Sequence, residues 1–299
     1  MSELLAAWWS AARPKTLWAG VAPVLMGTAV ARFEGGLHLP AAAAALVCAL
    51  LIQVGTNLAN DYFDARKGAD TAERLGPRRG LQHGRLTLAQ VRTGFLVCFA
   101  LAVLLGAYLL ARGGWPILWI GLSSVALGVL YTGGPAPLAY LGLGDIFAFA
   151  WFGPIAVAGT TYVQTLAWST PALLGGLAAG CFSVAILTVN NFRDLEQDRA
   201  AGKHTLAVRF GADFARWEFR LALLAAALLP LVLLLRAGQP QGLLTPALLL
   251  LALLPLLWRT LPAQPRRDAR FGDAMNRLLA LTGKLELLYA LLFSAAYWL

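Results

Sequence analysis

The chain has 299 residues, of which 59% are hydrophobic and only 13% are charged, whereas an ordinary soluble domain has about a quarter charged residues. Together with a mean hydropathy of +0.67, this composition excludes a soluble globular fold and predicts a polytopic membrane protein. The formal net charge of +9 would suit a nucleic-acid partner, but the positions of the basic residues argue against one.

Apolar stretches of nearly the ~20 residues that cross a bilayer as a helix recur along the whole chain. The N-terminal segment has no basic region before an apolar core, so we expect no signal peptide and a first segment that stays in the membrane. The pattern predicts an all-α integral membrane protein, a helical bundle of nine spans. Their approximate ranges are 17–32, 40–62, 88–111, 115–132, 143–162, 171–193, 217–235, 243–258 and 278–298.

The basic residues indicate the orientation of these spans. If the N-terminus is cytoplasmic, all but three of the 24 Lys and Arg residues lie in or beside cytoplasmic segments, the exceptions being Arg32, Arg112 and Arg236. This is the positive-inside bias of a membrane protein. Two of the cytoplasmic loops, 64–87 and 194–216, are long and polar. We therefore expect a bacterial cytoplasmic (inner) membrane protein whose N-terminus and functional loops face the cytoplasm.

Two similar polar motifs lie at the ends of the second and sixth predicted spans. Asn60 and Asp64 in the first motif correspond to Asn190 and Asp194 in the second, with the same offset of 130 residues. This match predicts an internal duplication, with two related halves of four helices plus a terminal helix. The chain would then be a single membrane-embedded domain, 1–299, with its motifs at 57–70 and 190–203.

The spacing of the acidic residues favours a metal site. Residues four apart on a helix share one face with about 6 Å of rise between them, so Asn190, Asp194 and Asp198 form one row. Like charges at that spacing near a low-dielectric medium repel and need a cation. Carboxylate and amide oxygens suit Mg²⁺, which completes its shell with water and phosphate oxygens. Two facing rows would hold a diphosphate between two Mg²⁺ ions.

Basic residues alternate with the acids in both motifs. Arg grips phosphate oxygens with paired hydrogen bonds, and Lys adds a mobile point charge. The plain alternative is that these charges form ordinary ion pairs at the membrane surface, but two matching copies favour an anion site. The candidate diphosphate-binding residues are Arg66, Lys67, Arg193, Arg199 and Lys203.

The motifs resemble those of the UbiA-type intramembrane prenyltransferase superfamily, most closely its 1,4-dihydroxy-2-naphthoate polyprenyltransferase branch of menaquinone synthesis. The resemblance extends over Arg13-Pro14-Lys15-Thr16, the 57–70 motif, the 76–80 stretch, Leu143-Gly144-Asp145 and the block 190–211. It implies Mg²⁺-diphosphate ligands in both motifs and diphosphate contacts from Arg199 and Lys203. The metal ligands it implies are Asn60, Asp64, Asp70, Asp194 and Asp198, and the duplication adds Asn190.

The resemblance also implies a reaction. A polyprenyl chain would pass from polyprenyl diphosphate to 1,4-dihydroxy-2-naphthoate, with release of diphosphate and CO₂, to give demethylmenaquinol. An acceptor of the 4-hydroxybenzoate or homogentisate type is the alternative within the superfamily. A secondary transporter is disfavoured, because both motifs end even-numbered spans on one side, whereas many transporters contain inverted repeats. The residues expected to be catalytic are Asn60, Asp64, Asp194 and Asp198.

The acceptor contacts are less defined. The turn 131–145 has no Lys or Arg, so the cation that pairs with an acceptor carboxylate stays unassigned. Tyr131 either faces positive charge that develops on the prenyl carbon or belongs to the interfacial aromatic belt. Asp145 is either a helix cap or a carboxylate that orients the acceptor. Arg13 and Lys15 are either part of a helix start at the headgroups or substrate contacts.

Overall fold

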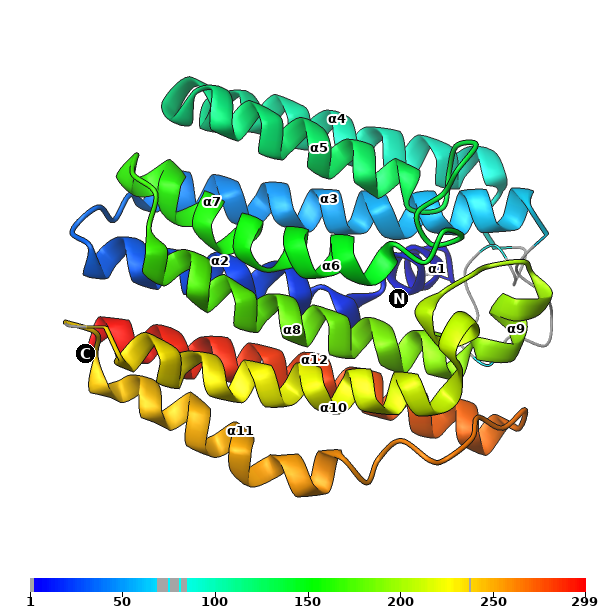
Figure 1. Ribbon diagram of the computed structural model, residues 1–299. Coiled ribbons are helices and arrows are strands. Elements are labelled where there is room, and N and C mark those ends of the chain that lie inside the picture. Colours follow the sequence, from blue (N-terminus) through cyan, green and yellow to red (C-terminus); the bar gives the residue numbers. More distant parts are fainter. Residues whose placement is uncertain (1–2, 69–74, 76–80, 82–84, 237) are drawn as a thin grey trace.

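The computed structural model describes residues 3–68, 75, 81, 85–236 and 238–299, and every regular element within them is helical (Figure 1). The all-α prediction is confirmed for this part of the chain. The α helices are α1 Glu3–Ala12, α2 Trp18–Phe33, α3 Leu39–Arg66, α4 Leu88–Gly113, α5 Trp115–Leu130, α6 Gly144–Phe152, α7 Pro154–Thr165, α8 Thr170–Arg193, α9 Leu195–Ala200, α10 Leu206–Leu234, α11 Leu244–Leu257 and α12 Ala269–Trp298. Two 3-10 helices, η1 Pro14–Thr16 and η2 Gln241–Leu243, precede α2 and α11.

The number of membrane spans is confirmed only in part. Among the described residues, six helices are long and apolar enough to cross a membrane, if α6 and α7 count as one span. A seventh candidate is the pair α1 and α2, which is bent by 50°, whereas α5 and α11 are shorter apolar helices. Each of the nine predicted spans coincides with one of these helices, but the count of nine stays a prediction.

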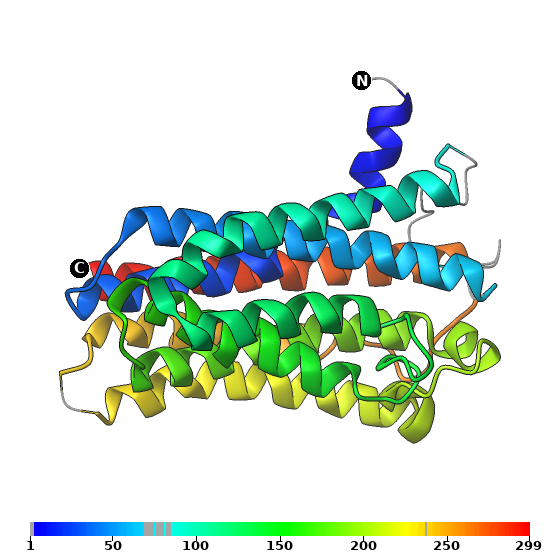
Figure 2. The same ribbon diagram turned by 90° about the horizontal axis from the view of Figure 1, so that it is seen from above.

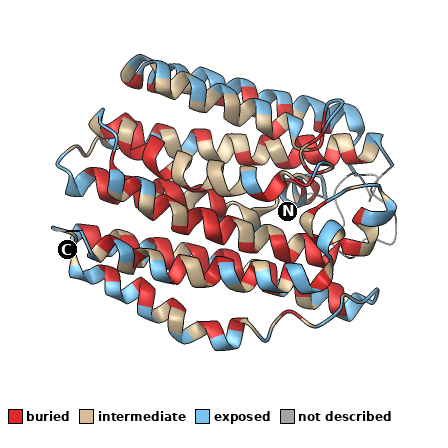
Figure 3. Cartoon of the chain, in the orientation of Figure 1, coloured by how far each residue is buried: buried red, intermediate tan, exposed pale blue. Residues whose placement is uncertain are grey.

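The outer helices carry large apolar side chains on their exposed faces. Leu104 on α4 is 70% exposed, and Trp115 and Trp119 on α5 are 71% and 66% exposed. Hydrocarbon surroundings accept such side chains, whereas they would be unfavourable over so large an area in water. In α8, by contrast, 72% of the most apolar stretch is buried, against 22% in α4 (Figure 3). The bundle therefore presents an apolar exterior and is built around α8.

Glycines let the neighbouring helices approach α8 closely. A Cβ atom on Gly175 would lie 2.7 Å from the ring of Phe293 on α12, and one on Gly176 would lie 2.5 Å from Pro154 on α7. A Cβ on Gly180 would lie 2.5 Å from the backbone oxygen of Phe149 on α6. Small residues at such contacts are typical of helix packing in membranes. These close contacts fix the position of α8 and therefore that of the second motif at its C-terminal end.

The polar segments gather at one end of the bundle. Helices α3, α5 and α8 all end there, beside α9 and the turn between α5 and α6 (Figure 1). At the same end α1 stands out from the bundle (Figure 2). The two motifs therefore lie at the same end of the bundle, as the predicted order of spans requires, while the internal duplication stays a prediction.

Candidate active site

A polar cavity of about 70 Å³ lies where the two motifs meet. Its walls come from the end of α3, the turn after α5, the end of α8 with α9, and the segment before α10. Both motifs and the turn thus contribute to one site. The lining residues are Arg13, Asn60, Asp64, Tyr131, Thr132, Ala139, Asn190, Asn191, Asp194, Gln197, Asp198, Lys203 and Thr205.

The carboxylates of this cavity are buried. Asp64, Asp194 and Asp198 are 3%, 6% and 8% exposed. A buried carboxylate is stable only if it is paired with a positive charge or a metal. The arrangement of cations around these three acids is therefore the central feature of the site.

Lys203 joins the two motifs. Its Nζ lies 3.3 Å from the Asp64 carboxylate and 3.8 Å from Asp198 Oδ1. The backbone N–H of Lys203 donates to the Asp198 carbonyl at 2.8 Å, and Gly202 supplies the left-handed turn, with φ of 70°, that points Lys203 back into the site. The positive charge of Lys203, in the second motif, therefore pairs with Asp64, in the first.

Arg193 holds the second motif rigid. The side chain is 3% exposed, and its Nε and Nη2 donate to the two oxygens of Asp194 at 2.7 and 2.5 Å. The same guanidinium donates to Asn190 Oδ1 and to Asn276 Oδ1 on α12, both at 2.7 Å. Asn276 in turn donates to the carbonyl of Leu75 at 3.3 Å. Arg193 therefore fixes the orientation of Asp194 instead of reaching into the cavity.

The row of the second motif survives a break in the helix. Asp194 is the C-cap of α8 and the N-cap of α9, yet the backbone N–H groups of Asp194 and Asp198 donate to the carbonyls of Asn190 and Asp194, at 3.0 and 2.7 Å, and keep the spacing of four. All three side chains line the cavity.

The turn between α5 and α6 covers the first motif. Thr132 Oγ1 donates to Asn60 Oδ1 at 2.8 Å, and Lys67 Nζ donates to the Thr132 carbonyl at 2.7 Å. Lys67 and Lys203 also lie 4.4 and 5.5 Å from the centre of the Tyr140 ring. Partial burial lowers the pKa of Lys67 from its ordinary value, and the charge of Asp64 opposes that shift. The turn therefore contacts both Lys67 and Lys203 and holds them beside the cavity.

Other residues of the first motif hold the N-terminal bend. Asp61 is 1% exposed and forms an ion pair with Arg13, which has a left-handed backbone with φ of 53°. Asn57 Nδ2 donates to the carbonyl of Ala12 at 3.0 Å and to Thr16 Oγ1 at 3.4 Å. Arg13 therefore enters the cavity wall because α3 anchors the bend between α1 and α2.

Several predicted site residues lie away from the cavity. Arg66 is exposed and lies 5.7 Å from the Tyr62 ring, and Arg199 is exposed and bonds Glu196 at 3.0 Å. Asp145 is buried in the first turn of α6, whose N-cap is Leu143, so the cap interpretation of Asp145 is wrong. Asp70 lies outside the described residues.

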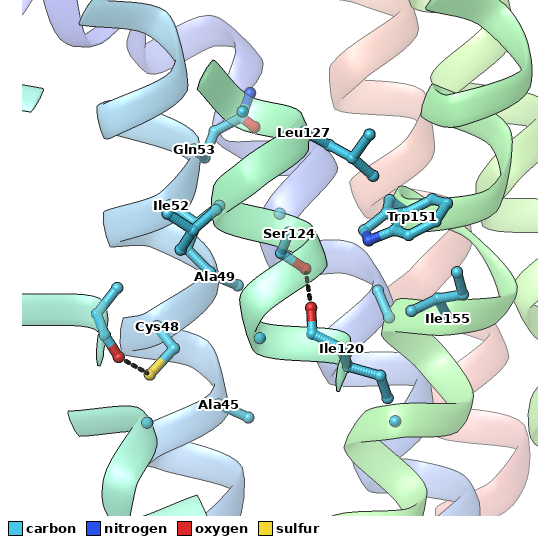
Figure 4. A pocket seen from close by; sticks show the side chains of 18 of the residues that line it. Ala45, Cys48, Ala49, Ile52, Gln53, Ile120, Ser124, Leu127, Trp151 and Ile155 are labelled. Atoms are coloured by element: carbon cyan, nitrogen blue, oxygen red, sulfur yellow. Dashed lines mark hydrogen bonds between the residues drawn. The ribbon is translucent and has the colours of Figure 1, made fainter. Parts of the chain in front are cut away.

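A second, apolar cavity of about 380 Å³ is enclosed by the six helices from α2 to α7 (Figure 4). Its wall consists mainly of Ala, Gly, Val, Leu and Ile side chains. Tyr131 lines both this cavity and the polar one. The site therefore offers a polar chamber and an apolar chamber that share one aromatic side chain.

The polar chamber is chemically suited to Mg²⁺ shared with a substrate. Within the described ranges, no three His, Cys, Asp or Glu side chains are arranged to hold a metal by themselves. However, six Asn and Asp side chains line one cavity, and Mg²⁺ prefers oxygen ligands, takes one or two carboxylates and relies on water and phosphate oxygens for the rest. The residues thus fit an ion bound jointly by protein and diphosphate.

The sequence did not reveal three contacts of this site. Thr132 and Tyr140 lie in a segment rich in glycine and proline, which predicts a turn but does not indicate which of its side chains contact the motifs. Asn276 lies on α12, far along the chain from both motifs, and only its contact with Arg193 identifies it.

A bundle of apolar helices with a buried chamber of acids and basic residues beside an apolar chamber suits a lipid substrate whose anionic head is bound through cations. The model of the UbiA prenyltransferase family matches residues 20–296. The chain therefore belongs to the UbiA prenyltransferase family.

Relatives and solved structures agree with this membership. The chain is 36% identical to a 1,4-dihydroxy-2-naphthoate octaprenyltransferase of Mycobacterium tuberculosis over 97% of this chain and 96% of that protein. It is also 36% identical to the protein of that name from Haemophilus influenzae, over 76% and 77%. A UbiA homolog from Archaeoglobus fulgidus bound to DMAPP and Mg²⁺ superposes with a TM-score of 0.66 at 15% identity, covering 98% of this chain and 99% of that one. A UbiA homolog from Aeropyrum pernix superposes with a TM-score of 0.60 at 16% identity, over 99% and 98%.

Proposed function

We propose that this protein transfers a polyprenyl chain from polyprenyl diphosphate to 1,4-dihydroxy-2-naphthoate and releases diphosphate, CO₂ and demethylmenaquinol. The observation that carries the proposal is the pair of chambers that share Tyr131. A polyprenyl diphosphate has a charged head and a hydrocarbon tail, which match the polar and the apolar chamber. The naphthoate acceptor is supported by the names of the relatives from several bacteria.

The polar chamber would bind the diphosphate. Lys203 reaches both motifs, and Arg13 and Lys67 approach from the bend and from the end of α3. Bound Mg²⁺ would supply further positive charge for the leaving diphosphate. We propose two such ions, because each motif offers its own oxygen ligands. The residues that would hold them are Asn60 and Asp64 in the first motif and Asn190, Asp194 and Asp198 in the second, with Asp70 as a further ligand by resemblance.

The chemical step needs no protein nucleophile. As the allylic carbon–oxygen bond breaks, its electron pair leaves with the diphosphate, and the cations of the polar chamber stabilise that charge. An electron-rich ring carbon of the acceptor then forms the new carbon–carbon bond. The carboxylate leaves the ring as CO₂, and the electron pair of the broken bond stays with the ring. Tyr131 would face the positive prenyl carbon, and the apolar chamber would keep water away from it.

The remaining basic residues have separate roles. Arg193 would orient Asp194, whereas Arg66 and Arg199 would attract the anionic donor at the cavity entrance. Asp145, which is buried at the start of α6 and lines neither cavity, would orient the acceptor only indirectly. The protein would sit in the bacterial cytoplasmic membrane with nine spans, two related halves, and both the N-terminus and the site on the cytoplasmic side.

The acceptor is tested directly with purified protein in detergent. The protein is incubated with Mg²⁺, a labelled prenyl diphosphate and one acceptor at a time: the dihydroxynaphthoate, 4-hydroxybenzoate or homogentisate. We expect labelled product and released CO₂ only with the naphthoate. Product with either of the other acceptors, and none with the naphthoate, would reassign the enzyme within the family.

A further inference from the structure

Two polar atoms in the wall of the apolar cavity lack a protein partner. Gln53 Oε1 on α3 and Trp151 Nε1 on α6 are buried and have no hydrogen-bond partner among the described residues. Both residues line the cavity, as Figure 4 shows. Gln53 is only 8% exposed. One atom is an acceptor and the other is a donor, so the wall offers a ligand one hydrogen bond of each kind.

A hydrocarbon tail does not account for these atoms. A buried polar group without a hydrogen bond destabilises the protein by roughly 1–3 kcal/mol, and a prenyl chain offers neither donor nor acceptor. Phenolic hydroxyls offer both, because one O–H can donate to Gln53 Oε1 and the oxygen of a second hydroxyl can accept from Trp151 Nε1. The chemistry of the wall therefore matches an aromatic alcohol.

The orientation of the Gln53 amide is fixed by its other end. Gln53 Nε2 donates to the carbonyl of Thr16 at 3.5 Å, and Asn57, one turn later on α3, bonds Thr16 Oγ1. The N-terminal bend thus holds the amide nitrogen, and the amide oxygen is left for the cavity. The same contacts link Gln53 to the segment that carries Arg13.

Gln53 and Trp151 each lie about two helical turns from a residue beside the polar chamber. Gln53 precedes Asn60 by seven residues on α3, which places it roughly 10 Å along the helix axis from the first motif. Trp151 follows Gly144 by seven residues on α6, and a Cβ on Gly144 would lie 3.0 Å from the Tyr131 hydroxyl. Helix α3 runs toward the site and α6 runs away from it (Figure 1). Gln53, Trp151 and Tyr131 therefore line one apolar cavity, with Tyr131 at its polar end.

We propose that Gln53 and Trp151 form the acceptor subsite, where each binds a hydroxyl of the dihydroxy aromatic acceptor and the pair orients its ring toward Tyr131. This inference rests on the proposed function, since it assigns the second substrate of that reaction. The proposal also divides the apolar cavity between the two substrates. The part beside Gln53 and Trp151 receives the acceptor, and the rest receives the prenyl tail.

The test compares the variants Gln53→Leu and Trp151→Phe with the wild type in steady-state kinetics. We expect each variant to raise the KM for 1,4-dihydroxy-2-naphthoate by about tenfold, the equivalent of one lost hydrogen bond, and to change the KM for the prenyl diphosphate less than twofold. The matched control is Ser123→Ala on α5. Ser123 Oγ bonds the Trp119 carbonyl at 2.6 Å and lies outside both cavities, so neither KM should change.

Monohydroxy naphthoates sharpen the test. Removing the hydroxyl that Gln53 binds should raise the KM of the wild type but not that of Gln53→Leu, because the partner is already gone. A KM that rises only for the prenyl diphosphate, or no change in either KM, overturns the proposal. Thermal unfolding of each variant separates a local effect from misfolding. Failure of the proposed function is recognised independently, because the wild type would then not use the naphthoate at all.

Discussion

The Lys203 ammonium lies 3.3 Å from the Asp64 carboxylate, although 139 residues separate them in the chain. Asp198 lies 3.8 Å from the same ammonium. One cation of the second motif therefore neutralises an acid from each motif, so the two halves of the polar chamber form one electrostatic unit. A diphosphate bound there would compete for this lysine.

Lys203 and Arg199 should differ in importance. Both are basic residues of the second motif, but Lys203 lines the cavity while Arg199 is exposed and pairs with Glu196. We expect Lys203→Ala to lower kcat/KM for the prenyl diphosphate by about 10²-fold. Arg199→Ala should lower it several-fold at most, because its contact is screened by solvent. Equal losses in the two variants, measured by initial rates, would contradict this placement.

Asn276 should act through Arg193. Its side chain accepts a hydrogen bond from Arg193 at 2.7 Å and donates one to the Leu75 carbonyl at 3.3 Å. In Asn276→Ala the guanidinium loses one partner, so the Asp194 carboxylate becomes less well oriented. We expect about a tenfold higher Mg²⁺ concentration for half-maximal rate.

The Mg²⁺ titration of this variant is compared with that of Asn276→Gln, which keeps the amide. Partial recovery in the glutamine variant is expected. A Mg²⁺ requirement unchanged in Asn276→Ala would exclude a positioning role for this residue.

The apolar cavity should limit the prenyl chain. Gly106 on α4 and Gly121 on α5 line it, and a Cβ on either would meet no atom within 4 Å. A phenylalanine at position 121 can therefore enter the cavity without displacing backbone. We expect Gly121→Phe to discriminate against long donors while geranyl diphosphate is still used, whereas Gly121→Ala should retain the wild-type preference. Competition between short and long donors measures this shift, and an unchanged preference would show that the tail lies elsewhere.

Hydropathy predicted the helices of the bundle better than their ends. Predicted spans such as 88–111 and 171–193 match α4 and α8 closely. In contrast, α10 begins at Leu206 instead of 217 and α12 at Ala269 instead of 278. The segments 206–216 and 269–277 each contain three charged residues, so a search for continuous apolar stretches does not detect them. Their caps, Thr205 and Asp268, each accept a backbone hydrogen bond three residues on, at 3.3 and 2.8 Å.

The site was predictable only where it is local. The spacing of four within each motif identified the row of Asn190, Asp194 and Asp198, because a helix brings such residues to one face. Which cation meets which acid depends on contacts between distant segments, and alternating charges do not specify them. For this reason both Arg199 and Lys203 were predicted to bind the diphosphate, although of the two only Lys203 lines the cavity.

The central claim is that the buried acids of both motifs bind Mg²⁺ and the diphosphate together. The most direct measurement is diphosphate release from the purified variants Asp64→Ala and Asp194→Ala, with the dihydroxynaphthoate present and Mg²⁺ varied. We predict that each variant inserts and folds but loses turnover by about 10²–10³-fold or more, and that EDTA abolishes release by the wild type. Near wild-type release from either variant in Mg²⁺, or release that persists in EDTA, would contradict the account.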